Sequence, residues 1–270
     1  MRFFLVVLPV LLAACGGSDT GPAGLSSTTS TVQRLSGLPG TDIGLARFRT
    51  TAGSETANGV FLLPGYAQIQ EGTSVGSAGI FEIVEIISET RNSDGSVSGE
   101  VVVRFPDGST ANIVGRLYDS TWLGLAISDQ GGIGAATGPA VSNMPVGNFS
   151  YEGYAYTEYN GVPGYSGSAF IEEGTFTMDV QFLNRTAQLQ ADWPESYYLN
   201  NALTFNSAGE IVGPGGTFYI YEGDGSTLIE TRPIDFHGTF HGSGATHVSG
   251  AGLEGSSAGD YALIAIIGSR

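Results

Sequence analysis

The chain has 270 residues, with 10 basic and 26 acidic side chains and a formal net charge of −16 at pH 7. Such an acidic chain repels nucleic-acid phosphates and anionic lipid head groups, which argues against nucleic-acid binding and against a basic patch as a membrane anchor. The single cysteine, Cys15, has no second cysteine with which to form an internal disulfide.

The first residues are typical of a bacterial lipoprotein signal. Arg2 precedes a twelve-residue apolar run, 3–14, which is too short to cross a bilayer as a stable helix. Leu12–Cys15, Leu-Ala-Ala-Cys, resembles a lipobox. We interpret residues 1–14 as a signal peptide that is removed, and Cys15 as the acylated first residue of the mature chain.

Gly16 follows the cysteine, where an aspartate would favour retention in the inner membrane. We therefore expect a lipid-anchored protein of the bacterial outer membrane. A secreted protein with a free cysteine is the alternative.

Two stretches have little to pack. Residues 15–37, rich in Gly, Ser, Thr and Pro, predict a lipidated flexible tether, and the glycine-rich residues 131–146 predict a linker between two domains. Elsewhere apolar residues alternate in short runs, and no stretch has a sustained helical period with capping residues. The chain is therefore predicted to be all-β.

Residues 38–130 contain the clearest hairpin. Runs at 99–105 and 110–117 flank the turn sequence Pro106–Ser109, and 80–90 adds a third strand to the same meander. Weaker strands are predicted at 44–50, 59–63 and 123–128.

Residues 147–270 contain eight candidate strands. Eight antiparallel strands can close into a barrel whose interior is just large enough to be filled by side chains. The strands are predicted at 147–157, 167–171, 174–182, 186–191, 202–206, 216–221, 234–241 and 260–267.

The second half resembles a known family. Residues 147–154, Gly-Asn-Phe-Ser-Tyr-Glu-Gly-Tyr, resemble the opening strand of the C-terminal barrel in transferrin-binding protein B-like lipoproteins. The segment 238–250 resembles that family's glycine, aromatic strand and turn, with Thr246 and His247 where an acidic residue is usual. The resemblance implies a single lobe: an N-terminal antiparallel β "handle" region, 38–130, followed by an eight-stranded antiparallel β-barrel, 147–270.

The resemblance also implies a function. Family members project from the outer membrane, capture host iron proteins and pass them to a TonB-dependent transporter. By resemblance, this chain is a surface-exposed, non-catalytic protein without a cofactor that captures a protein or an iron-bearing solute for such a transporter. The alternative is a structural or adaptor lipoprotein that binds another envelope component. The ligand does not carry over, because a fold does not specify its binding loops.

The three histidines raise the hypothesis of a metal site. His237 and His241 share a strand face but lie roughly 13 Å apart along the chain. Only His247, returning across a turn, approaches either of them. We expect these residues to be surface groups of a hairpin and not metal ligands.

Two further motifs have structural explanations. Residues 255–259 satisfy Gly-x-Ser-x-Gly, but no helix is predicted after Ser257 and every histidine precedes it, which argues against a hydrolase. Asn92, Asp94, Ser96 and Glu100 imitate part of a calcium loop, yet Val97 stands where that loop needs glycine. We expect a hairpin turn there and no catalysis.

Aromatic residues supply the candidate ligand contacts, since tyrosine and tryptophan offer rigid contact area at interfaces. We predict that residues 190–201 form a loop in which Trp193, Tyr197 and Tyr198 meet a partner. Tyr154 and Tyr156, on one strand face, are equally explained by barrel packing.

Overall fold

The computed structural model describes residues 25–34, 43–52, 55–64, 82–104, 108, 110–118, 123–128, 135–139, 141–160, 170–194, 197–222, 225–257 and 260–270. The chain divides into two compact units, residues 1–35 with 42–140, and residues 36–41 with 141–270. The described residues form strands and turns without a helix, which confirms the predicted all-β class. Within those ranges there is accordingly no long apolar helix of the kind that crosses a membrane.

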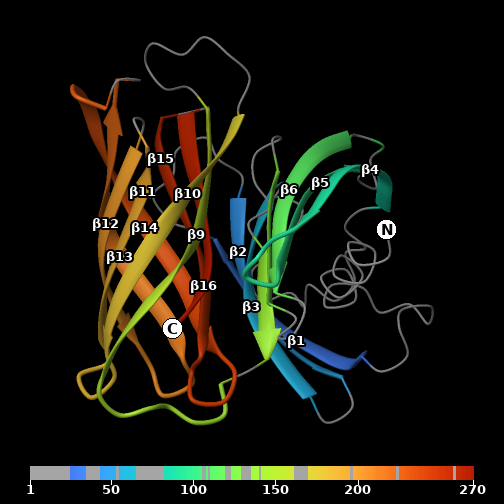
Figure 1. Ribbon diagram of the computed structural model, residues 1–270, viewed down its shortest axis with the longest axis vertical. Helices are drawn as coiled ribbons and strands as arrows, with labels where there is room; N and C mark the ends of the chain where they lie inside the picture. Colours follow the sequence, from blue (N-terminus) through green and yellow to red (C-terminus); the bar gives the residue numbers. More distant parts are fainter. Residues whose placement is uncertain are drawn as a thin grey trace. The chain divides into compact units, whose positions relative to one another are not determined.

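The first unit is one eight-stranded antiparallel sheet with the order β1-β2-β3-β8-β7-β6-β5-β4 (Figure 1). The last strand, β8, pairs with both β3 and β7 and so joins two meanders into one sheet. The predicted β-rich region before the barrel is confirmed. Its strands are β1 (Leu25–Arg34), β2 (Ile43–Ala52), β3 (Glu55–Pro64), β4 (Glu82–Arg91), β5 (Ser96–Arg104), β6 (Thr110–Tyr118), β7 (Leu123–Ser128) and β8 (Ala135–Pro139).

Two of these strands fall in stretches that the sequence predicts to be a flexible tether and a linker, so both predictions are wrong at these strands. β1 lies within residues 15–37 and β8 within 131–146. A strand in a sheet satisfies its backbone donors and acceptors through its neighbours, whatever its side chains contribute. A shortage of apolar residues therefore does not prevent a segment from joining a sheet.

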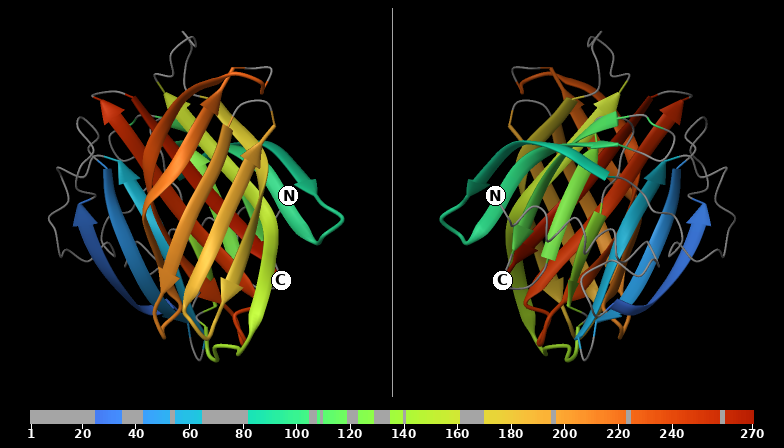
Figure 2. Two further views of the ribbon diagram at one scale, coloured as in Figure 1. Left: turned by 90° about the vertical axis from the view of Figure 1, so that its left-hand side faces the viewer. Right: turned by 90° about the vertical axis from the view of Figure 1, so that its right-hand side faces the viewer.

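The second unit is a closed barrel of eight antiparallel strands, as predicted, in which β16 pairs with β9. Figure 2 shows the strands running obliquely around the barrel, the tilt that closure of a sheet requires. The predicted strands at 167–171 and 174–182 both overlap one strand, β10. The strand β15 is not predicted from the sequence. The strands are β9 (Asn148–Asn160), β10 (Phe170–Gln181), β11 (Thr186–Trp193), β12 (Tyr197–Phe205), β13 (Glu210–Tyr221), β14 (Leu228–His241), β15 (His247–Ser257) and β16 (Asp260–Ser269).

The barrel interior is filled by side chains. Along β11 exposed and buried residues alternate without exception, the pattern of a strand with one face in the core. The largest side chains of this interior that are below 2 % exposure are rings: Trp193, Tyr151, Phe218, Phe236 and Phe240. All five belong to the hydrophobic core cluster.

Inward-facing glycines make room for these rings. A Cβ on Gly153 would lie 2.9 Å from the Phe176 ring, and a Cβ on Gly268 would lie 2.7 Å from it. A Cβ on Gly250 would likewise lie 2.3 Å from the Phe236 ring. Because carbon atoms need more than 3 Å, alanine does not fit at these sites without a shift of the ring or the backbone.

One end of the barrel, the Phe149 end, is packed by the segment that enters β9. Val141, Met144 and Phe149 pack against the core cluster. The Arg270 guanidinium lies 3.9 Å from the centroid of the Phe149 ring and donates to the Gly244 carbonyl at 2.6 Å. The last residue of the chain thus holds this end together through a cation–π contact and a hydrogen bond.

We predict that Gly250→Ala destabilises the barrel by about 1–3 kcal/mol, because the added Cβ would overlap the Phe236 ring. The check is a double-mutant cycle with Phe236→Leu, measured by urea unfolding. The cost of the alanine should be smaller beside leucine. Equal costs in both backgrounds would show that the ring is not what requires glycine.

Candidate functional site

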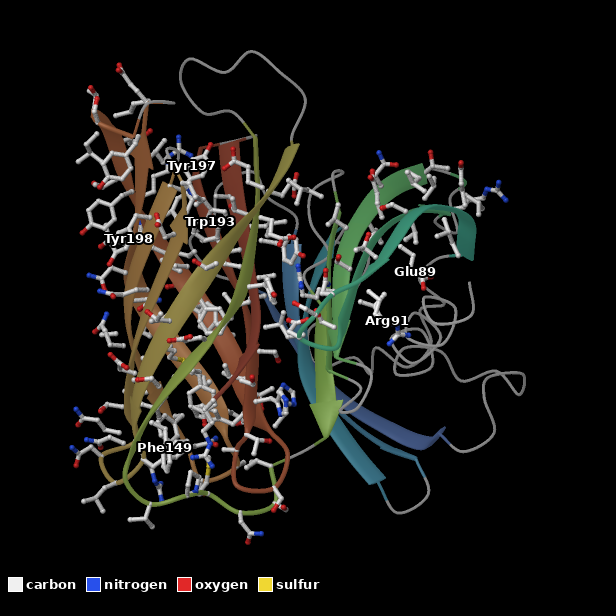
Figure 3. All side chains as sticks on the ribbon, viewed as in Figure 1. Glu89, Arg91, Phe149, Trp193, Tyr197 and Tyr198 are labelled. Atoms are coloured by element: carbon white, nitrogen blue, oxygen red, sulfur yellow. The ribbon has the colours of Figure 1, made fainter. Side chains whose placement is uncertain are left out.

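The predicted ligand contacts Trp193, Tyr197 and Tyr198 lie together at the other end of the barrel, the Trp193 end, where β11 ends and β12 begins (Figure 3). The connection between these strands is 194–196, so most of the predicted loop 190–201 is strand. Trp193 and Tyr197 face each other across the two strands and are 1 % and 2 % exposed. The prediction that all three lie in an exposed loop is therefore wrong.

The period of the strands explains this burial. Ala191 and Trp193 occupy alternate positions on β11, and Tyr197 and Leu199 do so on β12, all facing the core. A three-residue connection does not interrupt either alternation. Only Tyr198, one residue out of phase, faces outward.

The two inward rings are packed around Phe218. Tyr197 stacks on Phe218 with ring centroids 5.2 Å apart at 11°, and Trp193 meets the same ring edge-on at 5.9 Å. Among the residues that the structure describes, none hydrogen-bonds to the buried indole Nε1 of Trp193. Trp193 and Tyr197 thus serve as core and offer no surface to a protein partner.

Tyr198 begins an outward row of polar and aromatic side chains that sequence reasoning missed. The register places Asp192, Tyr198, Tyr219 and Thr231 opposite one another on β11, β12, β13 and β14. The Tyr198 and Tyr219 rings have centroids 5.8 Å apart at 46°. We call Tyr198, Tyr219 and Tyr221 with Asp192 the tyrosine face. Knowledge of the pairing register would have revealed it, since Tyr219 and Tyr221 are separated from Tyr198 in the sequence.

Asp192 is the charged member of the tyrosine face at neutral pH. Burial raises the pKa of the Tyr198 hydroxyl, and the neighbouring Tyr219, Asp192 and Tyr221 raise it further, so the phenol stays neutral. The Asp192 carboxylate attracts a cation, and neutral phenol rings offer their faces to it. The face therefore suits a positively charged group.

A second charged feature at the Trp193 end points inward. Arg232, opposite the inward Phe218 on β14, is 4 % exposed. Its guanidinium donates to Glu230 Oε2 at 3.1 Å. A buried guanidinium needs such a partner to offset the loss of hydration. In the sequence, Arg232 lies two and four residues before the apolar Ile234 and Phe236, and this alternation could have indicated that Arg232 faces the core.

The histidines are only partly brought together. Register pairs His241 directly with His247, whereas His237 pairs with Ala251. His241 Nε2 lies 2.5 Å from Ser249 Oγ, and His247 Nδ1 lies 2.9 Å from Thr246 Oγ1. Among the side chains that the structure describes, no group of three His, Cys, Asp or Glu residues is arranged to hold a metal ion. Contrary to expectation, His241 is fully buried.

Ser257 and the calcium-like sequence lie at hairpin turns. Ser257 is the last residue of β15 and Asp260 the first of β16, so the strand leads into another strand. Asp94 Oδ1 accepts from the Ser96 backbone N–H at 2.9 Å, and the Asn92 amide donates to Ser96 Oγ at 3.0 Å. The polar residues of 92–96 thus close the turn between β4 and β5, as predicted.

Of the other tyrosines considered in the sequence, Tyr151 and Tyr156 make hydrogen bonds within the barrel, and Tyr165 is not described. Tyr151 is buried and its hydroxyl donates to the Ala245 carbonyl, and the outward Tyr156 donates to Glu173 Oε2 at 2.7 Å. Tyr165, Cys15 and residues 1–14, which are predicted to be a signal peptide, lie outside the described residues.

Comparison with solved structures returns transferrin-binding protein B. The chain resembles that of Haemophilus parasuis with a TM-score of 0.49 and 11 % identity over 84 % of this chain and 51 % of the other. For serogroup B Neisseria meningitidis the TM-score is 0.45, with 8 % identity over 85 % and 63 %. For Actinobacillus pleuropneumoniae it is 0.42, with 12 % identity over 90 % and 97 %.

The chain thus spans about half the length of the Haemophilus parasuis chain. At these identities and TM-scores the likeness does not specify a ligand for this chain. No family model and no curated protein matches the sequence.

We predict that His247 makes the barrel less stable in mild acid. Burial lowers its pKa below the usual 6.5, so the unfolded chain takes up a proton at His247 before the folded chain does. The stability linked to His247 is therefore retained above pH 6.5 and falls as the pH drops from there toward the folded-state pKa.

The check is the free energy of urea unfolding of the native protein and His247→Asn at about pH 8 and pH 5.5. The native protein should lose more stability between the two values than the variant. An identical loss in both would contradict a buried, neutral His247.

Proposed function

We propose that this chain is a non-catalytic binding lipoprotein of the bacterial outer membrane. Anchored through Cys15 and exposed at the cell surface, it captures a protein or an iron-bearing solute and passes it to a TonB-dependent transporter. The observation that carries the proposal is the filled interior of the barrel, where Trp193, Phe218, Phe236 and the other rings occupy the space that a lipid- or solute-carrying barrel would keep open.

A filled barrel leaves recognition to its outer faces and loops. The tyrosine face at the Trp193 end offers such a surface, and Tyr198 and Tyr219 are only partly buried there. Tyrosine is favoured at interfaces because it combines a large rigid contact area with a polar tip.

The anchor is proposed from the lipobox-like Leu12–Cys15. Each buried methylene of an acyl chain contributes about 0.8 kcal/mol to membrane binding, and more than one chain on a cysteine gives stable attachment. An anchored binding protein meets its ligand next to a transporter in the same membrane, which raises the effective concentration for transfer.

Cys15 gives a direct test of location. We predict that the native chain is labelled by palmitate, fractionates with the outer membrane and is removed by protease from intact cells. Cys15→Ala should abolish the label and release the chain from the membrane. A variant at an exposed turn, Ser207→Ala, serves as the control and should behave as the native chain.

The partner is tested by pulldown from detergent-solubilised envelopes with the native chain as bait. Recovery of a TonB-dependent receptor by a shaved, surface-exposed chain is the expected result. A protease-protected chain that recovers only periplasmic or peptidoglycan-linked proteins would overturn ligand capture and support the structural-adaptor alternative.

A further inference from the structure

We propose that the tyrosine face binds a basic protein segment, one that presents guanidinium or ammonium groups to Tyr198, Tyr219 and Tyr221. The inference rests on the proposed function of a surface-binding protein and names the chemistry of its partner. Three observations carry it: the pairing of the rings, the distribution of charge along these strands, and the polar character of the surrounding positions.

The rings form one continuous outward surface across β12 and β13. Tyr198 and Tyr219 are directly opposite in register with their rings 5.8 Å apart. Tyr221 follows two residues along β13 on the same face, and its cross-strand partner Leu228 is 48 % exposed. The charged group of an arginine or lysine side chain is attracted to the face of a tyrosine ring. The aliphatic part of that side chain can pack on a neighbouring apolar side chain such as Leu228.

The charge along this part of the barrel is almost entirely negative. Residues 170–232, which supply β10 to β13 and the start of β14, contain nine acidic residues and two basic ones, Arg185 and the inward Arg232, which is paired with Glu230. Arg185 lies in the turn between β10 and β11, at the Phe149 end and far along the strands from Tyr198. Asp192 stands directly beside Tyr198 in the row.

The next positions on this outer surface are polar. Gln190, Asn200 and Thr217 form the adjacent outward row on β11, β12 and β13, and Thr231 closes the tyrosine row on β14. An apolar partner would leave these groups and Asp192 without water, at a cost in free energy. A basic segment instead pairs with Asp192, places its cations on the rings and leaves the polar groups hydrated.

The test is binding of fluorescein-labelled nona-arginine to the full chain in non-ionic detergent at physiological salt, read by fluorescence anisotropy. Because any polycation is attracted to an acidic protein, the decisive variant keeps the charge constant. Tyr198→Ser with Tyr219→Ser should weaken binding roughly tenfold. Tyr198→Phe with Tyr219→Phe keeps both ring faces and should bind within about threefold of the native chain.

The charge is tested by a matched pair of substitutions. Asp192→Asn should weaken nona-arginine binding several-fold, whereas Glu210→Gln removes the same charge at the opposite end of β13 and should have little effect. Circular dichroism melting curves check that each variant is folded.

Unchanged nona-arginine affinity in the folded double serine variant would overturn the proposal. Maltoheptaose, a neutral oligosaccharide, is tested in parallel. If the double serine variant loses maltoheptaose binding but keeps nona-arginine binding, the face binds carbohydrate and the proposal is overturned. These outcomes are independent of protease shaving and pulldown, so failure of the basic-segment inference leaves the proposed location and capture role intact.

Discussion

The limited space inside an eight-stranded barrel is the constraint on which the second unit depends. Closure removes the sheet edges but leaves a narrow interior that side chains must fill at the density of a crystal. This barrel fills it with rings, so that Phe176 needs glycine at positions 153 and 268 and Phe236 needs glycine at 250. The high glycine content, 42 residues in the chain, is therefore partly a packing requirement. Rings and glycines on neighbouring strands also fix the register, since a slip of one residue would bring a ring against a side chain.

The filled interior leaves the outer surface for the proposed recognition, and the strand period separates core residues from surface residues. On β12, Tyr197 stacks on Phe218 in the core, and Tyr198, the next residue, faces solvent beside Asp192. The same alternation puts Phe218 inside and Tyr219 outside on β13. Neighbouring aromatic residues thus have unrelated functions, one in stability and the other in surface chemistry. A substitution at the inward member of either pair tests folding, while one at the outward member tests binding.

The sequence predicted the class of fold and the eight-stranded barrel because period-2 alternation and turn residues are local signals. It did not place β1 and β8, whose pairing depends on backbone groups of distant strands. It predicted a loop at 190–201 that contains Trp193 and Tyr197, whereas both residues belong to strands, at the end of β11 and the start of β12. The tyrosine face was not predictable either: Tyr198 and Tyr219 meet only through the register of β12 and β13, which no local pattern specifies.

The distribution of the few basic residues connects the fold to the surface. Removal of the proposed signal peptide, which contains Arg2, would leave 9 basic against 26 acidic residues, a formal charge of −17. Of the basic residues in the barrel, Arg232 lies inside and Arg270 is engaged over Phe149 and on the Gly244 carbonyl. Both are thus engaged within the barrel, and among the described side chains of the barrel no basic residue faces outward beside Tyr198. Net charge of one sign repels itself within a compact chain and attracts the opposite charge from solution. A basic partner on this surface would relieve that repulsion, so binding and stability of the barrel would be coupled, with the partner raising the free energy of unfolding.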